Sequence, residues 1–196
     1  MSDSRFGAER AAELLRSLGE QLAAARAPFD LVVIGGSALL ALGLVERSTR
    51  DVDVLAILHG ELLAPADPLP PELTVARDRV AQDFGLPSNW LNSGPTELLR
   101  FGLPHGFLAR VESRTYGDAL TVRYASRLDQ IHFKLYAMVD QGAGRHENDL
   151  RALTPSAGEL LMASRWALTH DPSEGFRQEL EAALAHLGLA DVDLGA

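Results

Sequence analysis

The chain has 196 residues, of which 46% are hydrophobic and 23% charged, as in an ordinary globular protein and unlike a disordered chain. It contains no cysteine, which excludes disulfides, thiolate nucleophiles and cysteine-based zinc sites, and it shows neither a membrane-span-length apolar run nor a signal-peptide pattern, so we expect a cytoplasmic protein without a membrane partner. The formal net charge of −9 argues against non-specific nucleic-acid binding, which depends on neutralising phosphates with lysine and arginine.

The first half of the chain alternates helical and strand-like patterns. Apolar residues recur at helical spacing near the start, and short β-branched runs bounded by turn residues follow. Four prolines between residues 65 and 71 predict a rigid surface loop. The elements predicted here are helices over residues 7–26, 37–44 and 72–84 and strands over 31–34 and 51–58.

The second half predicts one antiparallel strand pair followed only by helices. The strands cover residues 107–112 and 120–124, with a turn at Gly117-Asp118. The helices cover 127–140, 146–153, 156–170 and 174–187. We therefore predict an α+β fold: a small mixed β-sheet core with flanking helices over residues 1–125, and a C-terminal helical bundle over 126–196 packed on that core.

A glycine turn follows the first predicted strand. Leu31 to Ile34 is apolar and leads directly into Gly35-Gly36-Ser37. Because glycine has no Cβ, the backbone N–H groups of such a turn can approach a phosphate closely. The alternative for Ser37 is that it only caps the helix that follows.

Two carboxylates begin the second predicted strand, in the run Asp51-Val52-Asp53. Side chains alternate along a strand, so both carboxylates lie on one face while Val52 points into the core. Mg²⁺ is usually held by one or two carboxylates together with substrate phosphates. The run therefore predicts a Mg²⁺ (or Mn²⁺) site that takes a nucleoside triphosphate such as ATP; the alternative is a solvated strand face.

Two blocks of this sequence carry a family resemblance. Gly36-Ser37 followed by Asp51-Val52-Asp53 resembles the GS…DxD signature of the DNA polymerase beta-like nucleotidyltransferase superfamily, in its minimal branch. The runs Ile131–Ala137 and Arg145–Leu153 are similar to the lysine and aspartate motifs of AbiEii and MenT-type toxin nucleotidyltransferases, and of relatives described as nucleotidyltransferases of unknown function.

The resemblance implies roles for particular residues. The catalytic residues would be Asp51, Asp53, Lys134 and Asp149, with Mg²⁺ on the first two, and the nucleotide would be bound by Gly35, Gly36, Ser37, Thr49 and Arg50. Lys134 is the only lysine of the chain. Arg50 could instead pair with an acid, and Asp149 could be an N-terminal helix acid favoured by the helix dipole. A third carboxylate, if present, would be Glu112 or Asp118.

The implied reaction is transfer of a nucleoside monophosphate to an acceptor, with release of pyrophosphate. The acceptor stays open among an RNA end, including tRNA, a protein side chain and a small molecule, and the resemblance adds the possibility of a toxin with an antitoxin partner. The alternatives are a nucleotide-binding module without turnover and an antibiotic nucleotidyltransferase. A local basic patch around the site would suit an RNA acceptor, and the arginines available for it are Arg47, Arg50, Arg110, Arg114, Arg123 and Arg127.

Overall fold

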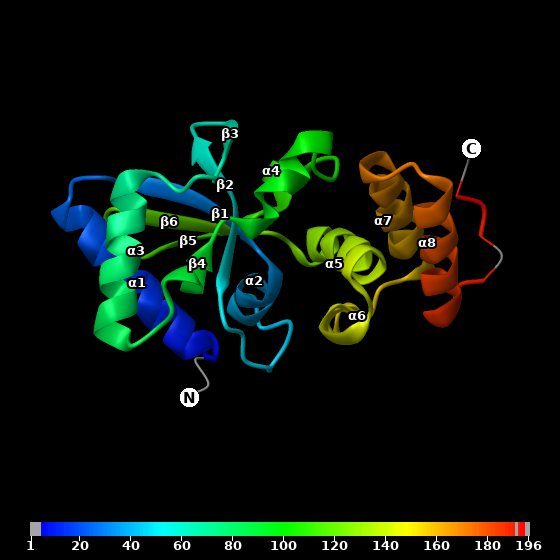
Figure 1. Cartoon of the computed structure of the whole chain (residues 1–196), viewed down its shortest axis with the longest axis horizontal. Helices are drawn as coiled ribbons and strands as arrows, with labels where there is room; N and C mark the ends of the chain where they lie inside the picture. Colours follow the sequence, from blue (N-terminus) through cyan, green and yellow to red (C-terminus); the bar gives the residue numbers. More distant parts are fainter. Residues whose placement is uncertain (1–4, 191, 195–196) are drawn as a thin grey trace. The chain divides into compact units, whose positions relative to one another are not determined.

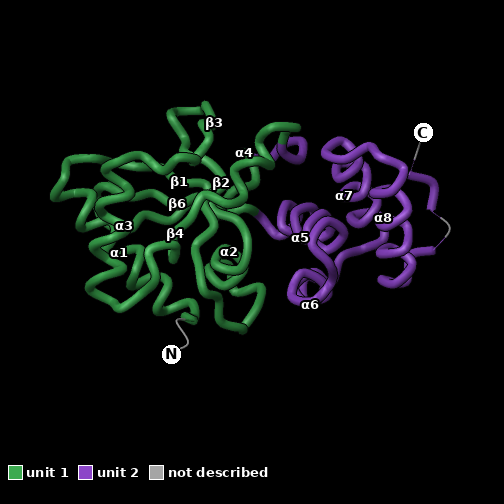
Figure 2. The backbone as a smooth tube through the Cα atoms, viewed as in Figure 1, with its two compact units in different colours: residues 1–102, 108–125 green, residues 103–107, 126–196 purple. Residues whose placement is uncertain are grey.

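The computed structural model describes residues 5–190 and 192–194 of the chain. It forms two compact units, coloured separately in Figure 2. Unit 1 comprises residues 1–102 and 108–125, and unit 2 comprises residues 103–107 and 126–196. Unit 1 contains the sheet, and the long helices of the second half of the chain belong to unit 2. The predicted boundaries of functional domains, 1–125 and 126–196, stay a prediction.

Unit 1 contains both helices and strands (Figure 1). In chain order they are α1 (Ala8–Ala24), β1 (Phe29–Ile34), α2 (Gly35–Ala41), β2 (Val52–His59), β3 (Leu62–Pro65), α3 (Pro71–Phe84), the 3-10 helix η1 (Ser88–Trp90), β4 (Leu91–Asn92), the 3-10 helix η2 (Gly94–Phe101), α4 (Phe107–Arg110), β5 (Glu112–Thr115) and β6 (Leu120–Tyr124). Unit 2 contains α5 (Arg127–Gln141), α6 (Gly144–Ala152), α7 (Ala157–His170) and α8 (Glu174–His186).

The sheet of unit 1 is mixed, as predicted. Its strand order is β3-β2-β1-β6-β5, and β4 pairs with β2 outside this path. β1 is antiparallel to β2 and parallel to β6, while β5 is antiparallel to β6. Together with the flanking helices, this mixed sheet confirms the α+β class.

The core of unit 1 lies where α1 and α3 cover the sheet. Alternate residues of β1, Leu31 and Val33, belong to the same buried cluster as Leu14 and Leu18 of α1 and Leu73 of α3. This alternation is expected for a strand with two distinct faces. Because both faces of β1 and β2 are almost fully buried, these strands form the rigid centre of the unit.

The register of the central strands brings three elements to one end of the sheet. Ile34, the last residue of β1, pairs with Asp53 on β2, and Asp53 pairs in turn with Asn92 on β4. An irregularity in the pairing of β1 with β2 lies between Val32 and Val33. Gly35, which follows Ile34, is therefore next to Asp53 of β2.

The strand predicted over residues 107–112 was wrong. Residues Phe107–Arg110 form the short helix α4, and the strand that pairs with β6 is β5, which begins at Glu112. Leucine, alanine and arginine are good helix formers, and the run lacks the alternation of a half-buried strand. The prediction also missed β3, β4 and η2, since such short elements leave little periodicity in a sequence. The helices of unit 2 begin and end within two residues of the predicted bounds.

Unit 2 is held by helix caps and by an aromatic cluster. Ser156 and Glu159 form a capping box at the start of α7, and Arg127 at the start of α5 donates to Glu159 at 2.6 Å. Trp166 of α7 meets Phe133 and Tyr136 of α5 edge to face. Across both units, none of the helices that the structure describes is long and apolar enough to cross a bilayer.

Candidate functional site

The Asp53 carboxylate lies directly against the glycine turn, Gly35-Gly36-Ser37. Gly35 has a φ of +74°, a conformation that strains residues other than glycine. A Cβ placed on Gly35 would also collide with Oδ2 of Asp53. The backbone conformation therefore favours glycine here, and a larger residue would also force the end of the Asp53 side chain to move, because this side chain lies directly against the turn.

Both carboxylates of the Asp51-Val52-Asp53 run accept hydrogen bonds from neutral side chains. Nδ2 of Asn92 donates to Oδ1 of Asp53 at 3.1 Å, and Oγ1 of Thr49 donates to Oδ1 of Asp51 at 3.3 Å. The two acids are half-buried, while Val52 between them is fully buried. The run thus presents two carboxylates that accept hydrogen bonds, with Asp51 directly before β2 and Asp53 within it. Their role as metal ligands stays a prediction.

Gly36 faces a second pair of residues. A Cβ on Gly36 would lie 2.8 Å from Oγ1 of Thr49 and 3.1 Å from Nη2 of Arg47. Arg47 is half-buried, and its Nη1 donates to the carbonyl of Ser48 at 3.0 Å. Arg47 therefore brings a positive charge against the glycine turn. Arg50, the arginine predicted to bind nucleotide, is exposed, and that role stays a prediction.

Ser37 does not cap a helix. α2 begins at Gly35, two residues earlier than predicted, so Ser37 lies inside its first turn, and the capping position, Ile34, has no side-chain cap. The Ser37 side chain is 2% exposed, and its Oγ has no hydrogen-bond partner in the part of the chain that the structure describes. A buried hydroxyl without a partner is costly, which marks the turn as a place where a polar ligand would be stabilising.

The residues at this sheet end fit a divalent cation bound through oxygen. Asp51 and Asp53 supply the carboxylates, and the missing Cβ of Gly35 leaves room for the Oδ2 atom of Asp53. Such a site suits Mg²⁺, which takes one or two carboxylates and completes its shell with substrate oxygens and water. No group of three or more acidic, histidine or cysteine side chains suited to a metal ion occurs among the described residues.

Neither proposed third acid joins the pair. Asp118 is exposed in the turn before β6, whose first residue, Leu120, pairs with Phe29 at the beginning of β1 and so at the far end of that strand from Gly35. Glu112 is exposed on the edge strand β5 and pairs with Tyr124, which pairs in turn with Val33, so it lies toward the Gly35 end of the sheet. It nevertheless forms no metal-binding group with the pair among the described residues. The third polar side chain beside Asp53 is instead the amide of Asn92.

Lys134 and Asp149 lie in unit 2 and contact each other. Nζ of Lys134 on α5 is 2.8 Å from Oδ2 of Asp149 on α6, and the two side chains are 7% and 1% exposed. Asp149 lies beyond the first turn of α6, so the alternative of an N-terminal dipole acid was wrong. The structure brings this pair together as a buried ion pair, while its joint action with Asp51 and Asp53 of unit 1 stays a prediction.

Two of the arginines considered for a basic patch are engaged in ion pairs. Arg123 on β6 binds Asp30 on β1 with both Nε and Nη2, and this bond raises the pKa of the guanidinium. Arg127 binds Glu159 within unit 2. These side chains join neighbouring elements, whereas Arg47 lies against Gly36 of the candidate site.

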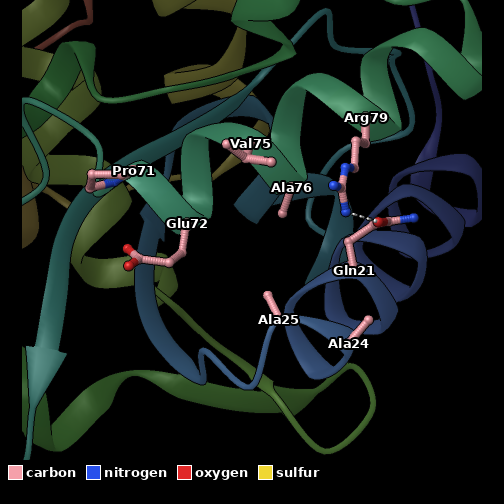
Figure 3. Close-up of a pocket in the computed structure, with 8 residues that line it drawn as sticks. All are labelled: Gln21, Ala24, Ala25, Pro71, Glu72, Val75, Ala76 and Arg79. Atoms are coloured by element: carbon pink, nitrogen blue, oxygen red, sulfur yellow. Dashed lines mark hydrogen bonds between the residues drawn. The ribbon is translucent and has the colours of Figure 1, made fainter.

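A pocket of about 430 Å³ lies elsewhere in unit 1, between α1 and α3. Figure 3 shows Arg79 reaching across it to Gln21, with Nη1 and Oε1 3.4 Å apart. None of the candidate site residues lines this pocket. The pocket is therefore separate from the candidate site.

The sequence analysis missed two residues of this arrangement, Asn92 and Arg47. Asn92 follows the buried Trp90 and Leu91, and a polar residue that ends an apolar run just before Gly94 is a signal for a strand end. Arg47 was considered only as part of a general basic patch. Its contact with Gly36 depends on the path of the loop between α2 and β2, which carries no periodic pattern.

Comparison with known families finds one family to which the chain belongs. A family model described as "Nucleotidyltransferase of unknown function (DUF6036)" matches residues 12–143. That range includes the glycine turn, both carboxylates, Asn92 and Lys134. No curated protein and no solved structure matches the chain.

Proposed function

Because the chain belongs to this nucleotidyltransferase family, we propose that it transfers a nucleoside monophosphate from a nucleoside triphosphate to an acceptor hydroxyl in a Mg²⁺-dependent reaction. The observation that carries the proposal is the contact of the Gly35 turn with Asp53, which is paired with Ile34 in the sheet and oriented by Asn92. A backbone turn and two oriented carboxylates at one sheet end suit a triphosphate and its cation.

The residues of unit 1 act by positioning and by charge. Asp51 and Asp53 would hold the cation, which would supply neutralisation of the triphosphate charge and polarisation of the α-phosphate. Thr49 and Asn92 keep the carboxylate oxygens oriented. The Gly35-Gly36-Ser37 turn and Arg47 bind the phosphates, because backbone N–H groups and a guanidinium fork are donors suited to phosphate oxygens.

The chemical step is a displacement at the α-phosphorus. A bond forms between the acceptor oxygen and phosphorus as the bridging bond to the β-phosphate breaks, and pyrophosphate leaves with the electron pair. The resemblance to toxin nucleotidyltransferases assigns Lys134 to the phosphate charge and Asp149 to the proton of the acceptor hydroxyl. These two roles extend the proposal to unit 2.

The acceptor is an RNA end, a protein side chain or a small molecule. The finer hypothesis is a toxin whose activity is blocked by an antitoxin protein. It predicts that expression of the wild type slows bacterial growth and that Asp53→Asn does not. Equal growth of the two strains at equal protein levels would remove the toxin hypothesis and leave the transfer reaction standing.

The proposal is tested with nucleoside triphosphates labelled at the α- or at the γ-phosphate. Purified protein, Mg²⁺ and a cell extract are incubated with each of the four nucleotides, and the wild type is compared with Asp51→Asn/Asp53→Asn. Only α-label should be transferred, and only by the wild type; nuclease or protease treatment then identifies the acceptor class. Transfer of γ-label would indicate a kinase, and transfer of no label would contradict the proposal.

A nucleotide-binding module without turnover is the second candidate. It is favoured by one observation, the lack of a third acid beside Asp51 and Asp53 in the described part of unit 1. This candidate predicts binding of a nucleoside triphosphate with Mg²⁺ but no pyrophosphate release. The same label experiment, run alongside a binding titration, separates the two.

A further inference from the structure

Asn92 makes a direct hydrogen bond to Asp53, a proposed metal ligand. It belongs to β4, a strand of only two residues that runs parallel to β2 and pairs Asn92 with Asp53. The preceding residues, Trp90 and Leu91, are fully buried. The backbone of Asn92 is therefore anchored in the sheet, and its side chain projects on the same side as the Asp53 carboxylate.

The orientation of the Asn92 amide follows from its second hydrogen bond. The backbone N–H of Gly94 donates to the Asn92 side chain at 2.9 Å, and an N–H can only be accepted by the carbonyl oxygen Oδ1. The NH₂ group must then point the other way, toward Oδ1 of Asp53 at 3.1 Å. One amide thus connects the start of η2 with the carboxylate on β2.

This arrangement has two physical interpretations. In the first, Asn92 only stabilises the turn before η2, as asparagine often does by accepting from the backbone two residues later. In the second, the turn holds the amide so that the amide can hold Asp53. The second accounts for both hydrogen bonds, and it agrees with the position of the other oxygen of Asp53, which lies against Gly35.

Resting on the proposed function, we propose that Asn92 is a positioning residue for the metal-binding carboxylate of Asp53. Its NH₂ group holds Oδ1 of Asp53 and thereby directs Oδ2 toward the glycine turn. Because the amide is neutral, it orients the carboxylate without adding a third negative charge to the pair formed with Asp51. Residues that orient metal ligands in this way commonly affect metal affinity by about 10–100-fold.

Three single substitutions in the full-length protein test the proposal. Asn92→Ala removes both hydrogen bonds. Asn92→Asp keeps an acceptor for the Gly94 N–H, so the turn before η2 survives, but it replaces the donor facing Asp53 with a charge. Asn89→Ala, three residues upstream at an exposed position of η1, is the matched control for an asparagine-to-alanine change. The probe is Mn²⁺ alone, and its binding is followed by water-proton relaxation.

We expect Asn92→Ala to bind Mn²⁺ at least about tenfold more weakly than the wild type and Asn89→Ala to bind like the wild type. Asn92→Asp should bind Mn²⁺ more tightly, since a third carboxylate then faces the cation, while its thermal unfolding stays that of a folded protein. Wild-type Mn²⁺ affinity in both Asn92 variants would overturn the positioning role of Asn92 but leave the proposed metal site standing. If the wild type binds no more Mn²⁺ than Asp51→Asn/Asp53→Asn does, the proposed metal site fails, and the inference with it.

Discussion

Replacing Gly35 with alanine should damage the candidate site more than the fold. The matched control is Gly43→Ala, because Gly43 has a similar φ, +67° against +74°, but no atom within 4 Å of a Cβ built on it. Both substitutions force a left-handed backbone on alanine, which costs about 1–2 kcal/mol. Only at Gly35 does the new methyl group also meet Oδ2 of Asp53.

The Asp53 carboxylate must move away from the new methyl group, and we expect this movement to break its hydrogen bond with Asn92. The lost hydrogen bond adds about 0.5–1.5 kcal/mol, so Gly35→Ala should lose about 1.5–3.5 kcal/mol of unfolding free energy and Gly43→Ala about 1–2 kcal/mol. Urea denaturation measures both. In a Mn²⁺ titration, Gly35→Ala should bind at least about tenfold more weakly, while Gly43→Ala keeps wild-type affinity. Equal Mn²⁺ binding in the two variants would refute this view of the glycine turn.

The other predictions concern the buried ion pair, the nucleotide phosphates and acid stability. Lys134→Met should lower the unfolding free energy by about 3–5 kcal/mol because it leaves Asp149 charged and buried, whereas Lys134→Met/Asp149→Leu should restore most of it; a double variant as unstable as the single one in urea would contradict this reasoning. Arg47→Gln should weaken triphosphate binding about 10–100-fold in calorimetry through loss of charge-assisted hydrogen bonds, and a larger loss in Arg50→Gln would point to the exposed arginine instead. The hydrogen bond from Arg127 lowers the pKa of Glu159 from 4.5 to about 2, so the unfolded chain binds a proton that the folded protein does not, and stability should fall as the pH falls through this interval. Glu159→Gln should flatten this part of the stability profile, and an unchanged slope would show that other carboxyl groups dominate.

Elements with a strong local pattern could be predicted from the sequence. The helices of unit 2 have sustained apolar spacing, and the strand pair at the centre of the sheet has apolar runs bounded by glycine, proline and aspartate. The fold class follows from these. The helix Phe107–Arg110 was missed because four residues are too few to show a helical period, although the residue types and the lack of alternation favour a helix.

The candidate site was predictable where its residues are close in sequence. Gly35-Gly36 follows directly from the first strand, and Asp53 lies in the second strand, which begins at Val52 and not at Asp51 as predicted. The shared face of Asp51 and Asp53, expected from strand alternation, stays a prediction. Asn92 reaches Asp53 from 39 positions away, through a two-residue strand whose pairing only the folded sheet establishes. The ion pair of Lys134 with Asp149 likewise depends on how α5 packs on α6, which residue spacing alone does not determine.

The most direct test of nucleotidyl transfer at Asp51 and Asp53 is the ratio of α-label incorporated to pyrophosphate released. It is measured with purified protein, Mg²⁺ and an acceptor fraction, for the wild type and for Asp51→Asn/Asp53→Asn. We predict one pyrophosphate for each nucleotide transferred by the wild type, and neither product from the variant. Release of orthophosphate in place of pyrophosphate, or equal incorporation by the two proteins, would contradict the assignment of the reaction to these carboxylates.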